Sequence, residues 1–335
     1  MGKVLTPAIE KQLKYHFRTG SLLGVTPYVW EANKDLPEIS SSRVKWMAWR
    51  ANHVLAVGIF IFGVLRSLQT NADDSAPVWS KVYMQFIIAL FFIATLTHTT
   101  NAFKKQEFIY FTCHLIKFLR NYDMTCEPGN LIRKKWTKIN LMTLWLIRSV
   151  ITLNALLFTT NAILRPDSPE LVTSLWSNGE RPLGVRVVIT AVFAAYTYST
   201  RSVVILLICA ILNFAFSILI ILEELSEKNQ MKFKNPVEKI HIFHQLQILV
   251  LEFNLVFKDT ILSFGKLLLL SIAVFSAYGA IRFDGILRVI LLIFGVDCTV
   301  VLVIMYSSLA EIAERSKGML ESWWRKLELL EHPTR

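Results

Sequence analysis

An apolar run of 39 residues, from Gly184 to Leu222, constrains the fold of this chain more than any other feature. It contains only two charged residues, Arg186 and Arg201, and no proline. A bilayer core about 30 Å thick needs only about 20 helical residues, so one crossing cannot use the whole run. It forms either two short spans with a hidden turn or one helix that continues beyond the membrane. Because a lipid-embedded turn would leave backbone groups unpaired and no Gly or Pro interrupts the run, the sequence favours one long helix.

Five more apolar segments accompany this run. With 53% hydrophobic residues and a mean hydropathy of +0.45, they predict an all-α, polytopic membrane helical bundle with six transmembrane helices. The fourth, fifth and sixth helices are expected to extend well into the cytosol and to form a shared bundle there. The six predicted spans are Trp49 to Leu68, Trp79 to Ala102, Ile139 to Leu164, the run from Gly184, a segment from Val237 that begins amphipathic and ends apolar, and Ile286 to about Leu309.

The predicted organisation has three parts: a cytosolic N-terminal segment (1–48), a six-span domain with its intracellular bundle (49–310) and a cytosolic helical tail (311–335). In the first part, Tyr28 and Trp30 are expected to touch the headgroup region, unless the segment is a partly disordered tail. The basic loop between the second and third spans is predicted to be an amphipathic helix broken at Pro128-Gly129.

The positive charge of the chain is a topological signal. The formal net charge is +11, and 26 of the 36 Lys and Arg residues fall on one side of the predicted membrane against 7 on the other. The positive-inside rule then places both termini in the cytosol. The expected location is the plasma membrane, with the N-terminus cytosolic. No basic patch is interleaved with stacking aromatic residues, so we expect no nucleic-acid partner. The first 45 residues contain no apolar signal-peptide core.

No sequence motif points to catalysis. The chain has no Walker loop, GxSxG, HExxH or CxxC motif, and it is therefore predicted not to be an enzyme and to need no cofactor. His241 and His244 share a helical face, but no third ligand has matching spacing, so no metal site is predicted. The four cysteines fall in a cytosolic loop or inside spans, and no disulfide is expected.

Three charged residues, Arg148, Arg201 and Asp297, lie several residues inside apolar sequence. An unpaired charge at such a position costs at least a few kcal/mol, so these side chains are expected to face the bundle interior or water. An ion pair between Asp297 and either arginine is geometrically allowed. Both a structural pair that fixes helix packing and a role in ligand or ion passage remain open.

The outer halves of the second, third, fourth and sixth spans supply candidates for a ligand pocket. A mostly aromatic cavity with a few hydroxyls and amides would suit a small organic ligand. Each of these residues taken singly is also consistent with ordinary packing, so the prediction concerns the group. The candidates are Tyr83, Phe86, Phe158, Asn161, Phe193, Tyr196, Thr197 and Phe294.

Three stretches resemble the arthropod gustatory and odorant receptor superfamily: LLGVTPYVW before the first span, EKIHIFHQLQILVLEFNLVFKDTILSFGKLLLL at the fifth helix, and MYSSLAEIAERSKGMLESWW where the sixth helix descends. The resemblance implies a receptor of the ligand-gated cation channel type, assembled as a homo- or hetero-tetramer in a lipid bilayer. It also implies a small organic ligand, an odorant or a tastant. The residues do not separate the gustatory from the odorant branch.

This chain departs from that family at its end. The resemblance implies a seventh helix that lines the central pore, whereas the sequence stops at Arg335 before a seventh span, so we expect a truncated or degenerate copy with no assignable pore residues. The alternative function is a small-solute transporter or an accessory six-span membrane protein. Transporters often contain internal repeats and interrupted helices, and neither is evident here.

Overall fold

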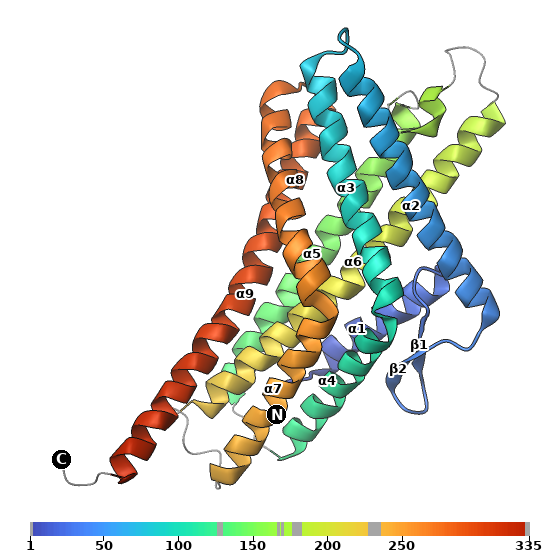
Figure 1. Ribbon diagram of the computed structural model, residues 1–335. Helices are drawn as coiled ribbons and strands as arrows, with labels where there is room; N and C mark the ends of the chain where they lie inside the picture. Colours follow the sequence, from blue (N-terminus) through green and yellow to red (C-terminus); the bar gives the residue numbers. More distant parts are fainter. Residues whose placement is uncertain are drawn as a thin grey trace.

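The computed structural model describes residues 3–125, 130–165, 168, 171–175, 183–226 and 236–331. Within these residues long helices run side by side in an elongated bundle (Figure 1). In chain order the elements are α1 (Pro7–Leu22), β1 (Tyr28–Glu31), β2 (Leu36–Ile39), α2 (Arg43–Ala72), α3 (Val78–Phe103), α4 (Lys105–Thr125), α5 (Asn130–Leu164), the short 3-10 helix η1 (Val172–Leu175), α6 (Leu183–Leu225), α7 (Pro236–Phe257), the π-helical turn η3 (Lys258–Leu262), α8 (Ser263–Arg282) and α9 (Ile286–Glu331).

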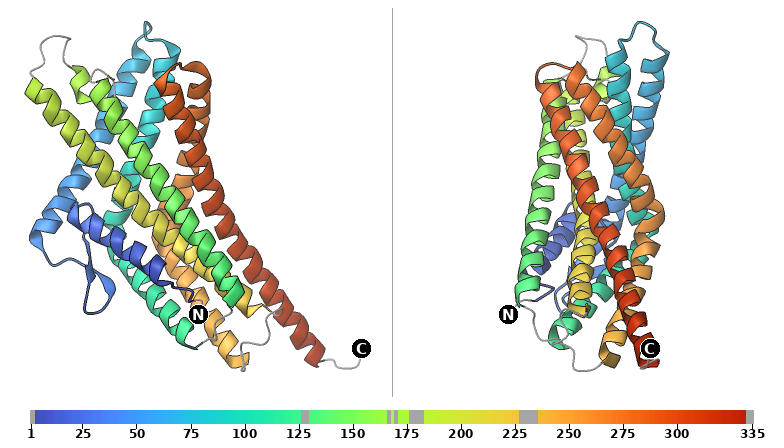
Figure 2. Two further views of the ribbon diagram at one scale, coloured as in Figure 1. Left: turned by 180° about the vertical axis from the view of Figure 1, so that it is seen from behind. Right: turned by 90° about the vertical axis from the view of Figure 1, so that its left-hand side faces the viewer.

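The two ends of the bundle differ in construction (Figures 1 and 2). We call basal the end that holds both termini, α1, the antiparallel hairpin β1–β2, α4 and α7. We call apical the opposite end, where short turns join α2 to α3 and α8 to α9. The predicted break at Pro128-Gly129 falls between α4 and α5, outside the described residues.

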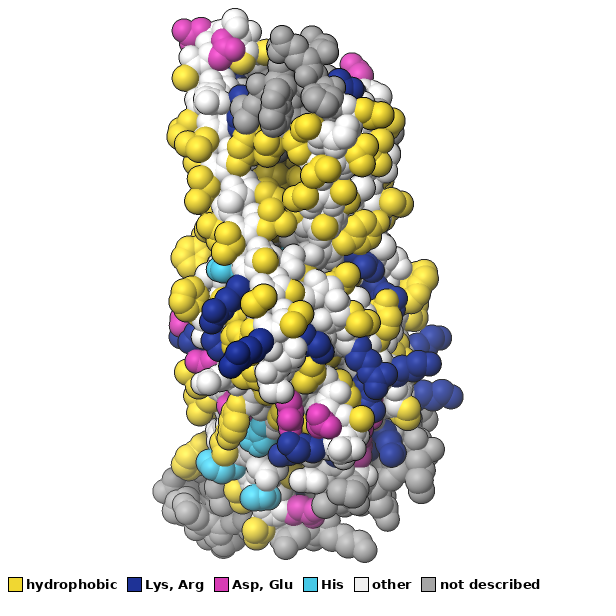
Figure 3. Space-filling model, turned by 90° about the vertical axis from the view of Figure 1, so that its right-hand side faces the viewer, with side chains coloured by type: hydrophobic (Ala, Val, Ile, Leu, Met, Phe, Trp, Pro, Cys, Tyr) yellow, Lys and Arg dark blue, Asp and Glu magenta, His cyan; other side chains and the backbone are white. Residues whose placement is uncertain are grey.

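Among the described residues, six helices are long and apolar enough to cross a membrane, which confirms the predicted number of spans. They are α2, α3, α5, α6, the continuous rod α7–η3–α8, and α9. The chain is a multi-pass membrane protein. On the face drawn in Figure 3, apolar side chains cover most of the apical half, and Lys and Arg gather over the basal half.

The apolar run that dominates the sequence forms the single helix α6, of 43 residues, so the prediction of one long helix is confirmed. Near its apical start α6 exposes Val187 and Val188, whereas from Val203 onward nearly every residue is buried. The basal half of α6 is therefore surrounded by other helices, and its side chains can be apolar all round for that reason.

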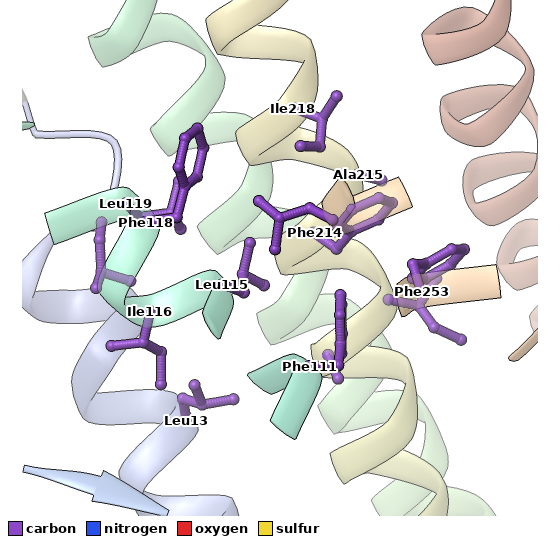
Figure 4. Packing of buried hydrophobic residues seen from close by; sticks show 14 of the residues in the cluster. Leu13, Phe111, Leu115, Ile116, Phe118, Leu119, Phe214, Ala215, Ile218 and Phe253 are labelled. Carbon is purple, nitrogen blue, oxygen red and sulfur yellow. The ribbon is translucent and has the colours of Figure 1, made fainter. Parts of the chain in front are cut away.

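The core of the basal end is built from aromatic residues on α4, α6 and α7 (Figure 4). Phe214 and Phe253 stack with ring centroids 4.2 Å apart and an interplanar angle of 9°. Phe111 meets Phe214 edge to face at 5.6 Å. Such pairs add about 0.5–1.5 kcal/mol each beyond the area they bury, so this cluster fixes three helices against one another.

The N-terminal segment is part of this core. Tyr28 is fully buried and Trp30 is 8% exposed, and both rings pack against Phe17 of α1. The Tyr28 hydroxyl donates to the amide oxygen of Asn101 on α3. The prediction that Tyr28 and Trp30 touch lipid headgroups is therefore wrong, and so is the alternative of a disordered tail. The apolar face of α1 offers these rings a protein surface, which buries them more completely than headgroups would.

A buried polar network ties the end of α6 to α4 and α5. The Arg133 guanidinium donates to both oxygens of Glu224, at 2.7 and 2.8 Å, and to Asp123 at 3.0 Å. The Tyr122 hydroxyl donates to Glu224 at 2.8 Å. The backbone amides of Val4 and Leu5 donate to the Asp123 carboxylate, so the same network anchors the start of the chain.

Gly24 provides a first testable prediction, because it follows α1 with φ at +63° and its missing Cβ would lie 2.6 Å from the Ala48 Cβ. A Cβ attached to fixed backbone cannot move away, so Gly24→Ala should destabilise the protein by about 2 kcal/mol and lower Tm in detergent micelles. Gly318→Ala is the matched control, since nothing lies within 4 Å of its added Cβ. Equal Tm values for the two variants would contradict the close contact between α1 and α2.

Candidate ligand-binding site

A cavity of about 180 Å³ lies inside the bundle, between α3, α5, α6, α8 and α9. Its walls are almost entirely apolar, and its polar groups are few. This combination is typical of sites for small organic molecules, in which apolar walls supply affinity and a few polar atoms set orientation. The residues used in the argument below are Phe91, Asn154, Ala155, Phe158, Phe193, Tyr196, Thr197, Thr200, Arg201, Phe294 and Asp297.

Aromatic rings from four helices form the walls. Phe158 of α5 meets Phe294 of α9 edge to face at 5.2 Å, and Phe91 of α3 meets Tyr196 of α6 in the same way at 6.0 Å. Phe193 lies one turn before Tyr196 and packs against it. Because these ring contacts join different helices, they fix the spacing of the cavity walls. A preformed pocket needs walls fixed in this way.

The polar groups of the cavity come from α5, α6 and α9. The Asn154 side-chain amide donates to the Asp297 carboxylate at 3.0 Å. The Thr197 hydroxyl lies 3.2 Å from that of Thr159, which is outside the cavity lining. The buried side-chain oxygen of Asn154 has no hydrogen-bond partner among the described residues. A buried acceptor without a partner is costly unless a bound molecule or water donates to it.

The structure brings together five of the eight candidate pocket residues. Phe158, Phe193, Tyr196, Thr197 and Phe294 line the cavity. Tyr83 and Phe86 belong to the apolar cluster that contains these rings, but they do not line the cavity. Asn161 does not line the cavity either. Of the three intramembrane charges, Arg201 and Asp297 line the cavity and Arg148 does not. Their role in ligand binding remains a prediction.

The allowed ion pair between Asp297 and an arginine is not formed. Asp297 bonds to Asn154 instead, while Arg201 donates through Nε to the Thr152 hydroxyl at 2.9 Å. The reason is depth along the bundle. Asp297 lies 11 residues from the apical start of α9, or about 16 Å, and Arg201 lies 18 residues from the start of α6, or about 27 Å.

Arg148 lies on the outside of the cavity wall, with its guanidinium 4.5 Å from the ring centroid of Tyr15 on α1. Arg148 and Arg201 both act on the neighbouring His16. Burial first, and then the positive charges of these two arginines, lower the pKa of His16 to about 4. The arginine pair therefore faces α1 on one side and, through Arg201, the ligand cavity on the other.

His16 gives a pH prediction. The imidazole pKa is about 6.5 in the unfolded chain and about 4 in the folded one, so only the unfolded state gains the proton between these values. The stability contributed by neutral His16 is complete above pH 6.5 and is lost as the pH falls towards 4, by about 3 kcal/mol in full. His16→Leu should remove this part of the Tm loss between pH 7 and pH 4.5, whereas His241→Leu, on the basal helix α7, should not. A wild-type and a His16→Leu profile that run parallel would contradict the assignment.

Asn154 and Ala155 are cavity residues that were not predicted from the sequence. A signal for them existed, since Asn154 lies four residues before Phe158, on the same helical face. Asp297 is likewise three residues after Phe294. Extending the pocket along these faces would have joined the aromatic and charged candidates into one site.

Comparison with known proteins identifies the fold. No family model matches the sequence, and no match was found among curated proteins. Among solved structures, the insect olfactory receptor OR5 from Machilis hrabei is similar, with a TM-score of 0.65 and 11% identity over 92% of this chain and 80% of that chain. The same receptor in complex with eugenol gives a TM-score of 0.60 and 12% identity over 91% and 81%. This chain therefore has the fold of an insect chemosensory receptor.

Proposed function

We propose that this chain is a chemosensory receptor subunit that binds a small organic molecule, an odorant or a tastant, between α3, α5, α6, α8 and α9. The observation that carries the proposal is the apolar cavity, which lies within a fold shared with an olfactory receptor over 92% of the chain. Its volume of about 180 Å³ is slightly larger than the roughly 150 Å³ cavity that holds one benzene molecule. The expected ligand is therefore a monocyclic compound or one of similar size.

The polar atoms of the cavity favour a ligand with a hydroxyl group. Asn154, Thr197 and Thr200 line the cavity, and the unpartnered side-chain oxygen of Asn154 can accept a hydrogen bond from such a group. A ligand donor at Asn154 would satisfy a buried acceptor, which is worth about 1–3 kcal/mol relative to leaving it unpaired. Small phenols and alcohols fit this arrangement better than hydrocarbons.

The proposal includes orientation and mode of action. Because the sequence topology puts 26 of the 36 Lys and Arg residues on the side of the chain ends, we assign the basal end and both termini to the cytosol of a cell with this receptor in its plasma membrane. Ligand in the cavity would shift a conformational equilibrium towards an open cation pathway in a tetrameric assembly. The resemblance of the sequence to odorant and gustatory receptors and the shared fold support this part of the proposal.

Ligand binding to the purified full chain tests the proposal. The chain is reconstituted in phosphatidylcholine nanodiscs, and Tm is followed as eugenol, the compound in one of the similar structures, is added. We expect a saturable rise in Tm, because a ligand that binds only the folded state stabilises it by RT ln(1 + [L]/Kd). A panel of monocyclic phenols, alcohols and matched hydrocarbons follows, and the hydroxylated members should bind more tightly. If no member of the panel gives a saturable rise, the proposal is wrong.

A further inference from the structure

The outward face of α1 carries positive charge. Ile9, Leu13 and Phe17 occupy the buried face of this amphipathic helix. Lys11, Tyr15, Arg18 and Leu22 follow one another at helical spacing on the opposite face, and all four are exposed. In the left-hand view of Figure 2, α1 lies obliquely across the outside of the bundle, with its N-terminal end lowest. Its C-terminal end, with Leu22, is therefore the end nearer the apolar part of the molecule.

Two arginines from the spans join this face. The Arg148 guanidinium packs on the Tyr15 ring at 4.5 Å, and Arg201 is held by Thr152, one helical turn along α5 from Arg148. Both arginines are only partly buried. Among the described residues, none of the carboxylates forms an ion pair with Lys11, Arg18, Arg148 or Arg201. Four cations thus share one surface without an anion to neutralise them.

The depth of these arginines matches a membrane surface. Arg201 lies about 27 Å from the apical start of α6, and Arg148 lies 16 residues, or about 24 Å, from the apical end of α5. A hydrocarbon core about 30 Å thick that begins near those apical ends therefore finishes at about their level. Trp145 is 66% exposed and Tyr15 44%, and exposed Trp and Tyr side chains concentrate in the interfacial layer.

We propose that Lys11, Tyr15, Arg18, Arg148 and Arg201 form a binding site for the phosphate headgroup of an anionic phospholipid in the basal leaflet. We call it the α1 phosphate site. Guanidinium groups present fixed pairs of N–H donors that match phosphate oxygens, and two of them side by side repel each other until an anion arrives. Basic pockets beside membrane helices on the cytoplasmic side are suited to such headgroups.

The surroundings favour a lipid over free phosphate. Leu22, on the same exposed face of α1 as Arg18, is 87% exposed. This side chain borders the cationic surface and would contact acyl chains while the arginines hold the headgroup. The surface therefore combines a cationic part for the headgroup with an apolar part for the acyl chains. Because Arg201 also lines the ligand cavity, the bound phosphate would hold the floor of that cavity from outside.

Native mass spectrometry of the purified full chain measures this binding. Short-chain phosphatidylinositol 4,5-bisphosphate is the probe, with short-chain phosphatidylcholine and inorganic phosphate as comparison ligands. We expect the anionic lipid to bind at least tenfold more tightly than either. Binding of phosphatidylcholine with equal affinity would overturn the headgroup assignment. Equal affinity for inorganic phosphate would show a site for free phosphate and overturn the lipid assignment.

Charge-matched variants locate the site. Arg18→Gln with Arg148→Gln removes two charges and should weaken lipid binding roughly 10- to 30-fold. Lys134→Gln with Lys135→Gln removes two exposed charges from the basal part of the same helix α5 and should leave binding within about twofold. Equal losses in both variants would show diffuse attraction of lipid to a basic protein and contradict a defined site.

A second variant keeps the test decisive if loss of Arg148 impairs folding. Lys11→Gln with Arg18→Gln changes only exposed side chains of α1, so the fold should be unaffected. Lipid binding should still fall at least fivefold. Unchanged binding in this variant would remove α1 from the site and overturn the proposal. Ligand binding in the cavity is measured separately, so failure here leaves the proposed receptor function to its own test.

Discussion

Glu224→Ala is expected to lower stability by about 3–5 kcal/mol, because it leaves the Arg133 guanidinium charged and buried without its main partner. Both side chains are 1% exposed, and three hydrogen bonds end on the Glu224 carboxylate. In thermal unfolding of the detergent-solubilised chain, Tm should fall by roughly 4–7 °C. Because Arg133 also bonds to Asp123, which holds the backbone of Val4 and Leu5, protease sensitivity of the N-terminal segment should rise as well.

The neighbouring residue provides the control. Glu223 lies on the same turn of α6, but its side chain is 31% exposed, and it pairs with the partly exposed Arg315. Glu223→Ala should therefore cost no more than about 1 kcal/mol. A Glu224→Ala protein as stable as the Glu223→Ala protein would show that the network is not formed. Replacing Glu224 with Gln, which keeps the shape but not the charge, should give an intermediate loss.

Ala155→Trp is expected to abolish ligand binding, with at least a hundredfold loss of affinity for eugenol or for any hydroxylated ligand found in the panel. Ala155 is 6% exposed and lines the cavity. An indole ring is larger than the benzene ring that a cavity of about 150 Å³ holds, so it would occupy most of the 180 Å³ available. The added ring fills existing space, so the loss of stability should stay below the 1–3 kcal/mol typical of overpacked cores.

Leu156→Trp is the matched control for the filled cavity. Leu156 is the next residue of α5, is 51% exposed and points away from the cavity lining. The same indole placed there should leave the ligand-induced rise in Tm unchanged. If Ala155→Trp retains that rise, the ligand binds elsewhere, and the cavity is not the site.

Much of the fold was predictable because a membrane-spanning helix can be recognised from its own stretch of sequence. The run from Gly184 to Leu222 has no helix breaker, and α6 extends it by only one residue at the start and three at the end. The backbone in lipid must satisfy its own hydrogen bonds, so an uninterrupted apolar run has few alternatives to a helix. The same reasoning gave six spans and the long fifth and sixth helices.

The basal end was less predictable, because its contacts join residues far apart in the chain. Arg133 and Glu224 are 91 residues apart, and each taken alone looks like an ordinary charge at the end of a span. Tyr and Trp are the residue types that concentrate at membrane interfaces, which is why Tyr28 and Trp30 were expected there. They are core residues because their rings pack against Phe17 on the apolar face of α1. Sequence periodicity shows that a face is apolar but not whether protein or lipid covers it.

The sequence predicted the aromatic residues of the candidate site but not its hydrogen bonds, which join different helices. Helical position placed Phe158, Tyr196 and Phe294 in the part of each span where the cavity lies. Helical counting placed Asp297 near the midplane and both arginines somewhat below it, and at that coarse level an ion pair between them was allowed. A hydrogen bond from the uncharged Asn154 satisfies the carboxylate instead.

The unbroken course of α6 makes it a lever arm. From Arg201, at the floor of the cavity, 24 residues lead to Leu225 at the basal end, a distance of about 36 Å. A tilt of about 3° at Arg201 would therefore move Leu225 by about 2 Å, similar to the helix displacements by which allosteric proteins switch. Because no proline or glycine interrupts α6 below Arg201, this rod has no hinge in which such a tilt could be absorbed. A small displacement that a bound molecule of one aromatic ring causes at Arg201 would thus become a larger displacement of α6 at the basal end.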